Sequence, residues 1–210
     1  MMKVGIMGGT FNPIHLGHVR LAKAAYEQFA LDKVLFIPSG EPPHKQDQYV
    51  AAGEHRMKMV ELAIKDYAYF EACDIEIMRE GYSYTSETLR ELHKRNPGED
   101  YFFILGADSL FQMEKWKKAD EIFEQCVVLA ANRDDIAEEK FFDEIKKIAK
   151  KFHGDIRPLD TPMMHISSTQ IREALGDNVL NAQDDVNPRF LDKNVVRYIL
   201  EHKLYEHEDV

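Results

Sequence analysis

A glycine-rich segment near the start of the chain carries two histidines, in the order Gly8-Gly9-Thr10-Phe11-Asn12-Pro13-Ile14-His15-Leu16-Gly17-His18. Gly8 and Gly9 leave backbone N–H groups accessible to a phosphate group, and a helix that starts behind the loop directs its positive end to the same place. His15 and His18 are three residues apart, so both rings can project from one face of a helix start. Imidazolium groups placed in this way can donate to a phosphate and stabilise a pentacoordinate transition state. Half of a zinc site is the alternative, although no third ligand follows at a familiar spacing.

A second cluster of polar side chains lies near the other end of the chain, in Ile166-Ser167-Ser168-Thr169-Gln170-Ile171-Arg172. Hydroxyl groups at a helix start share a face with an arginine one turn later, which again suits a phosphate. The alternative is structural, because Ser167 and Gln170 also have the spacing of a capping box and Arg172 could be a surface charge. The residues alone leave both interpretations open.

Alternating strand-type and helix-type segments must position these residues. The strand-type runs are 3–7, 34–37, 75–77, 101–105 and 126–131. The helix-type segments are about 17–29, 54–65, 83–95, 138–151, 167–175 and 194–203. This alternation is typical of βαβ units. We therefore expect the α/β class, with a Rossmann-like parallel sheet, helices on both faces and a small C-terminal helical part over about 166–210, within one domain spanning 1–210.

The composition is that of an ordinary water-soluble globular protein, with 44% hydrophobic and 30% charged residues among 210. A net charge of -10 argues against binding nucleic acid over the whole surface, so an anionic ligand needs a local basic pocket. The N-terminal residues lack a signal-peptide pattern, and no stretch has membrane-spanning length. Cys73 and Cys126 have no C-x-x-C spacing, which favours a reducing cytoplasm.

Both motifs resemble known signatures. The first resembles G-G-T-F-D-P-x-H-x-G-H of the nucleotidyltransferase superfamily, and the second is similar to its I-S-S-T-x-I-R signature. Further pieces resemble nicotinate mononucleotide adenylyltransferases in particular. They are Pro42-Pro43-His44-Lys45, Ser83-Tyr84-Thr85 before Thr88-Leu89, Gly106-x-Asp108 before Trp116, and Val195-x-x-Tyr198-Ile199 before Leu204-Tyr205. The resemblance spans nearly the whole chain.

The resemblance implies adenylyl transfer. The phosphate of nicotinate mononucleotide attacks the α-phosphorus of ATP in line, pyrophosphate leaves, and nicotinate adenine dinucleotide results in NAD biosynthesis. The implied ATP-binding residues are Gly8, Gly9, Thr10, Phe11, His15, His18, Ser168, Ile171 and Arg172. The implied catalytic residues are His15, His18, Lys45 and Arg172. Mg²⁺ would be held mainly by the ATP phosphates.

The resemblance also implies a site for the mononucleotide, at Thr10, Phe11, His44, Lys45, Thr85, Gly106, Asp108, Trp116 and Arg133. Each has a structural alternative. Lys45 could be a solvated lysine, Trp116 could be core packing, and Thr85 or Asp108 could cap a helix.

Two departures from the family pattern stand out. Asn12 takes the place of the usual aspartate, which removes a negative charge but should keep the turn, because both side chains bond local backbone. Asn132-Arg133-Asp134-Asp135 replaces the usual arginine, proline and glycine, which leaves the shape of that loop open.

Two other functions remain as alternatives: a phosphopantetheine adenylyltransferase, which shares the first loop, and a non-catalytic nucleotide sensor. The preference for nicotinate over nicotinamide rests on the resemblance alone. The sequence also leaves open whether the protein is a homodimer.

Overall fold

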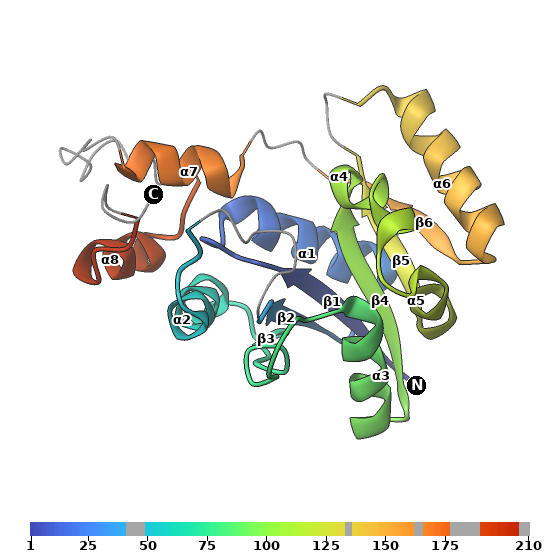
Figure 1. Ribbon diagram of the computed structural model, residues 1–210, viewed down its shortest axis with the longest axis horizontal. Coiled ribbons are helices and arrows are strands. Elements are labelled where there is room, and N and C mark those ends of the chain that lie inside the picture. Colours follow the sequence, from blue (N-terminus) through green and yellow to red (C-terminus); the bar gives the residue numbers. More distant parts are fainter. Residues whose placement is uncertain (41–48, 133–135, 162–165, 177–189, 206–210) are drawn as a thin grey trace. The chain divides into compact units, whose positions relative to one another are not determined.

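A six-stranded sheet forms the framework of the protein, which is described here from a computed structural model (Figure 1). The structure describes residues 1–40, 49–132, 136–161, 166–176 and 190–205. The strands run in the order β3-β2-β1-β4-β5-β6. Their bounds are β1 Met2–Gly9, β2 Lys33–Pro38, β3 Phe70–Ala72, β4 Glu99–Gly106, β5 Cys126–Ala131 and β6 Ile156–Leu159. The pairs β1–β4, β4–β5 and β5–β6 are parallel.

This strand order confirms the predicted α/β class with a Rossmann-like parallel sheet. The central strands read as continuous buried runs, Val4 to Met7 in β1 and Tyr101 to Leu105 in β4, which is typical of a sheet covered on both faces. The direction of strand addition reverses between β1 and β4. Sheets of this kind bind ligands beyond the carboxyl ends of the strands at that reversal.

Helices connect the strands, and those expected from the sequence are all present with ends shifted by one or two residues. Their bounds are α1 Leu16–Phe29, α2 Gly53–Ile64, α3 Thr85–Arg95, α4 Ala107–Leu110, α5 Ala119–Gln125, α6 Glu138–Phe152, α7 Ser168–Gly176 and α8 Lys193–Glu201, with a 3-10 turn η1 at Met113–Lys115. Helix α6 buries Phe141, Ile145 and Ile148 on one face, as its periodicity predicts. The predicted C-terminal helical part corresponds to α7 and α8.

The predicted strand at 75–77 is wrong. These residues form a turn, in which the Met78 N–H donates to the Asp74 carbonyl at 2.9 Å. Ile75 is buried, and the side chain of Ile77 lies beside Gly53 at the start of α2. One helical turn therefore buries Ile75 and partly buries Ile77, although their alternation resembles a strand. The third strand instead lies earlier, at β3.

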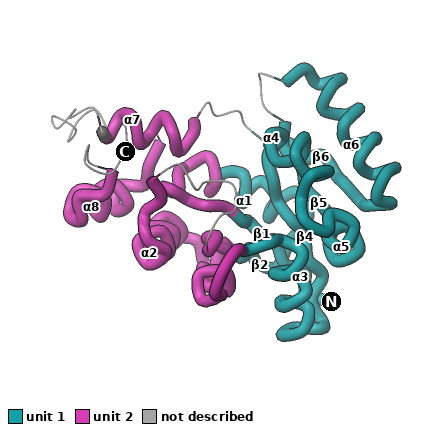
Figure 2. Tube along the Cα trace, viewed as in Figure 1, with its two compact units in different colours: residues 1–8, 20–35, 83–163 teal, residues 9–19, 36–82, 164–210 magenta. Residues whose placement is uncertain are grey.

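Contacts divide the chain into two compact units (Figure 2). Unit 1 contains residues 1–8, 20–35 and 83–163, and unit 2 contains residues 9–19, 36–82 and 164–210. Each unit is assembled from three separate stretches of the sequence. The single domain over 1–210 stays a prediction.

Other sequence expectations concern the membrane and the cysteines. Within the described ranges, no helix is both long and apolar enough to cross a bilayer. Cys73 and Cys126 are present as thiols, and Cys126 is buried. Burial raises the pKa of the Cys126 thiol to about 12.

Candidate functional site

The loop between β1 and α1 is packed around Phe11. This residue has a φ of 49°, a left-handed conformation that costs a non-glycine residue about 1–3 kcal/mol. Its buried ring contacts Phe36, with centroids 6.1 Å apart, and meets the His18 ring edge-on at 5.1 Å. A Cβ at Gly9 would lie 3.1 Å from the same ring, so Gly9 leaves room for Phe11. At Gly8 a Cβ would meet only an ordinary contact with Phe103.

His15 and His18 are brought together as their spacing predicts. Their rings stack with centroids 3.7 Å apart and planes inclined by 25°. The backbone N–H of His15 donates to Nδ1 of His18 at 3.2 Å. Because Nδ1 accepts, a neutral His18 carries its proton on Nε2. A Cβ at Gly17 would lie 2.9 Å from Nδ1 of His15, so glycine is needed there for this ring position.

Asn12 holds the loop to distant parts of unit 2. Its side-chain amide donates to the Tyr49 carbonyl at 2.9 Å, and its side-chain oxygen accepts from the Ala51 N–H at 3.0 Å and the Tyr205 hydroxyl at 2.9 Å. These partners fix which end of the amide is which, because a carbonyl only accepts and an N–H only donates. The expected turn is present at residues 12–13. The bonding partners of the side chain are distant in the sequence, however, and not the local backbone.

Helix α7 brings the second motif onto the first. The hydroxyl of Ser168 donates to the Pro13 carbonyl at 2.9 Å, and Nη1 of Arg172 donates to the Asn12 carbonyl at 2.8 Å. Ile171, which lies between Ser168 and Arg172 in the sequence, is buried. Ser167 and Gln170 do form the capping box, with the Gln170 N–H donating to the Ser167 hydroxyl at 3.2 Å. The capping box is therefore present and Arg172 bonds the loop, whereas phosphate binding by this motif stays a prediction.

Arg56 is a site residue that the sequence analysis missed. It lies in the first turn of α2, is 3% exposed, and donates to the Thr10 carbonyl at 2.9 Å. A single arginine between a histidine and a methionine carries no periodic or motif signal. Only its burial identifies it, because an arginine is almost never fully buried unless it is paired.

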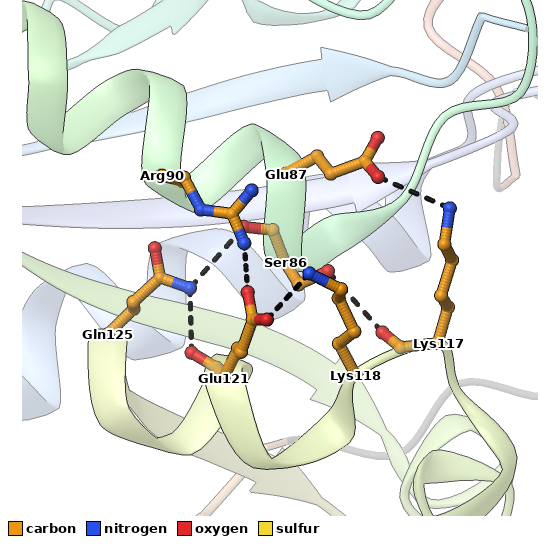
Figure 3. Close-up of polar contacts among 7 residues, drawn as sticks. All are labelled: Ser86, Glu87, Arg90, Lys117, Lys118, Glu121 and Gln125. Atoms are coloured by element: carbon orange, nitrogen blue, oxygen red, sulfur yellow. Dashed lines mark hydrogen bonds and ion pairs between the residues drawn. The ribbon is translucent and has the colours of Figure 1, made fainter.

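In unit 1 a polar network includes Ser86 and Lys117, the sequence neighbours of Thr85 and Trp116 (Figure 3). Thr85 is the first residue of α3, and its neighbour Ser86 donates through its hydroxyl to the Lys117 carbonyl at 3.4 Å. The remaining members drawn are Glu87, Arg90, Lys118, Glu121 and Gln125. Trp116 precedes Lys117 and is half-buried, with its ring edge-on to Phe103 at a centroid distance of 6.0 Å. Trp116 is thus only partly used in core packing.

The other residues predicted to bind the mononucleotide lie at the end of β4, in α4, or outside the described residues. Gly106 ends β4 and immediately precedes α4, and Asp108 lies exposed in the first turn of α4. His44, Lys45 and Arg133 lie outside the described residues.

Asn132 is the described residue of the loop that departs from the family pattern. Its side-chain amide donates to the Ile136 carbonyl at 3.2 Å.

Comparison with known proteins decides the family. A family model described as cytidylyltransferase-like matches residues 6–174. A probable nicotinate-nucleotide adenylyltransferase of Lachnoclostridium phytofermentans is 42% identical over 205 residues, which cover 98% of this chain and all of that protein. The chain belongs to the nicotinate-nucleotide adenylyltransferase family. A second probable family member, from a Thermoanaerobacter species, is 40% identical over 210 residues, which cover 99% of this chain and 96% of that protein.

Solved structures share the fold of this family member. A Plasmodium falciparum nicotinic acid mononucleotide adenylyltransferase, complexed with NaAD, matches with a TM-score of 0.77 and 19% identity over 98% of both chains. At that identity the match concerns the fold alone. A Vibrio parahaemolyticus structure, a nicotinate-nucleotide adenylyltransferase by its description, matches with a TM-score of 0.64 and 25% identity over 98% of this chain and 96% of the other.

Proposed function

We propose that this protein transfers the adenylyl group of ATP to nicotinate mononucleotide, giving nicotinate adenine dinucleotide and pyrophosphate in NAD biosynthesis. The observation that carries the proposal is the joining of the two motifs. Ser168 donates to the Pro13 carbonyl and Arg172 to the Asn12 carbonyl. These two carbonyls belong to the loop that continues into the stacked His15 and His18. The names of the relatives support the acceptor, since both are nicotinate-nucleotide adenylyltransferases.

His18 is the proposed donor to the reacting phosphate. Its Nδ1 accepts from the His15 N–H, so a neutral His18 carries its proton on Nε2, the atom proposed to donate to a phosphate oxygen. Negative charge grows on the α-phosphate oxygens as the pentacoordinate transition state forms, so a fixed donor there lowers the barrier more than it strengthens ground-state binding. His15, stacked on His18, keeps this ring in place and adds a second polar group.

The second motif is the proposed clamp for the triphosphate. Arg172 donates from Nη1 to the Asn12 carbonyl and from Nη2 to the Thr169 hydroxyl at 3.4 Å, and a guanidinium has five N–H donors in a planar fork. The remaining donors suit phosphate oxygens. Ser168 holds the helix start against the loop, and Ile171 is the proposed apolar wall for adenine.

The proposed acceptor site uses Thr10, Phe11, Thr85, Gly106, Asp108 and Trp116, together with His44, Lys45 and Arg133 outside the described residues. A half-buried tryptophan offers a face for stacking on the pyridine ring. Lys45 is the proposed cation for phosphate charge in a protein whose net charge is -10.

Enzymes of this family generally use a divalent metal ion. Among the described residues, no group of three or more His, Cys, Asp or Glu side chains is arranged to hold one. The loop and α7 offer backbone N–H and guanidinium donors, which suit phosphate oxygens rather than a metal ion. We therefore propose Mg²⁺ bound mainly to the ATP phosphates, where it neutralises their charge.

The proposed location of the protein is the cytoplasm, and its proposed assembly is a homodimer. Sedimentation velocity tests the proposed assembly.

The experiment is pyrophosphate release from ATP and Mg²⁺, with nicotinate mononucleotide, nicotinamide mononucleotide and phosphopantetheine supplied in parallel. We expect release with nicotinate mononucleotide far above release with the other two. Preferential release with phosphopantetheine would overturn the substrate. Tight ATP binding without release for any acceptor would indicate a nucleotide sensor.

A further inference from the structure

Arg56 is a buried cation whose hydrogen-bond partners, among the described residues, are backbone carbonyls. Its Nε donates to the Ala51 carbonyl at 2.8 Å, and its Nη1 donates to the Thr10 carbonyl at 2.9 Å and the Ser39 carbonyl at 2.6 Å. Its Nη2 donates to the Gly40 carbonyl at 3.2 Å. One side chain therefore joins three segments of unit 2: the loop after β1, the residues after β2, and the chain entering α2.

The charge of Arg56 is not neutralised by these contacts. In the described part of the chain, none of its hydrogen-bond partners is a carboxylate. Burial lowers the pKa of the Arg56 guanidinium, while Tyr205 and Glu76 oppose that shift. Arginine nevertheless keeps its proton at neutral pH, because its ordinary pKa is above 12. Burying a charged group costs several kcal/mol even in a protein that relaxes around it. Stability alone therefore explains this residue poorly.

The location of Arg56 suggests the benefit that offsets this cost. The Thr10 carbonyl that it bonds belongs to the loop of Gly8, Gly9 and Phe11, which ends at the histidine pair. Anionic phosphates are the proposed ligands of this loop, and a fixed positive charge beside it favours them.

We infer that Arg56 is a positioning residue for adenylyl transfer, which holds the phosphate loop in its reactive geometry through Thr10 and places a positive charge beside it. Its contacts to Ser39 and Gly40 fix the residues that lead from β2 toward the segment of His44 and Lys45. The inference rests on the proposed function. Arg56 is proposed to act in two ways. Its four hydrogen bonds fix the geometry of the loop, and its charge attracts anionic phosphates.

Two variants test these two actions. Arg56→Lys keeps the charge but cannot bond four carbonyls with a planar fork. We expect its kcat to fall about 100-fold, since small displacements in a site have effects of this size, with little change in the Kd for ATP. Arg56→Ala also removes the charge, so we expect a similar fall in kcat and about tenfold weaker binding of ATP. Arg20→Ala is the matched control, because Arg20 is an exposed arginine on α1, and it should leave both constants unchanged.

The readouts distinguish this role from a purely structural one. ATP affinity is measured by calorimetry, kcat by pyrophosphate release, and the folded fraction by thermal unfolding of each variant. If Arg56→Lys lowers the melting temperature but keeps kcat within about twofold per folded molecule, Arg56 is a structural clamp and the inference is wrong. If Arg56→Ala does not fold, Arg56→Lys still decides the geometric action. If the unaltered protein binds ATP but turns over no acceptor, the proposed function fails, whereas the effect of the charge on ATP affinity can still be measured.

Discussion

Gly17→Ala separates the position of His15 from the stability of the fold. A Cβ at residue 17 would lie 2.9 Å from Nδ1 and 3.0 Å from Cε1 of His15, whereas ordinary contact begins at 3.4 Å. The ring must therefore withdraw by about 0.5 Å, and its stack with His18, now at 3.7 Å, is disturbed. Since a misplacement of 1 Å can cost about 100-fold in rate, we expect kcat to fall about 10- to 100-fold, equivalent to about 1.4–2.7 kcal/mol.

The folded state should tolerate the same change. Residue 17 lies in α1, where alanine is favoured over glycine by up to about 1 kcal/mol, and the crowded group is a side chain that can move. We therefore expect thermal unfolding within a few degrees of the parent protein.

Gly98→Ala is the control for the Gly17 variant, because a Cβ there meets no atom within 4 Å. Steady-state kinetics and calorimetry are compared for the two variants. Full turnover by Gly17→Ala would show that the ring position of His15 does not limit the rate. A collapse of the melting temperature alone would show that the contact is structural.

Three further perturbations test separate features. His18→Ala should lower kcat about 10²- to 10³-fold and weaken ATP binding much less, because a donor to the transition state acts mainly on rate; equal losses in the two constants contradict that role. Asn12→Asp replaces an amide donor that lies 2.9 Å from the Tyr49 carbonyl with a carboxylate, and should lower the free energy of unfolding by about 1–3 kcal/mol in denaturant titrations; an unchanged midpoint would count against this bond. Because the pKa of Cys126 rises from 9.0 to about 12 on folding, the unfolded chain loses this proton first, and stability should fall as the pH rises from about 9 toward 12; a Cys126→Ser variant that falls equally steeply would contradict this assignment.

The parts of the fold that were predictable are those with a local cause. Continuous apolar runs specified β1, β4 and β5, and amphipathic periods specified the long helices. Strand β6, with the sequence Ile156-Arg157-Pro158-Leu159, was missed because a charge and a proline resemble a loop. It lies at the edge of the sheet, where a strand tolerates a proline that cannot donate on its open side.

The site was predictable where its residues are contiguous. The closeness of the His15 and His18 rings follows from their spacing, although their stacking does not, and a motif singled out Ser168 and Arg172. The role of Asn12 could not be predicted, because its side-chain partners Tyr49, Ala51 and Tyr205 are 37, 39 and 193 residues away. The role of Arg56 could not be predicted either, because its partners are backbone carbonyls, which every sequence supplies.

The central claim is that this protein moves an adenylyl group from ATP to nicotinate mononucleotide. The most direct test supplies ATP labelled at the α-phosphate, nicotinate mononucleotide and Mg²⁺, and follows the label by chromatography and mass spectrometry. The account predicts label in nicotinate adenine dinucleotide, with one unlabelled pyrophosphate released per dinucleotide formed and the label absent when His18→Ala replaces the parent protein over the same short time. Label that stays in ATP, or enters another acceptor in preference, would contradict it.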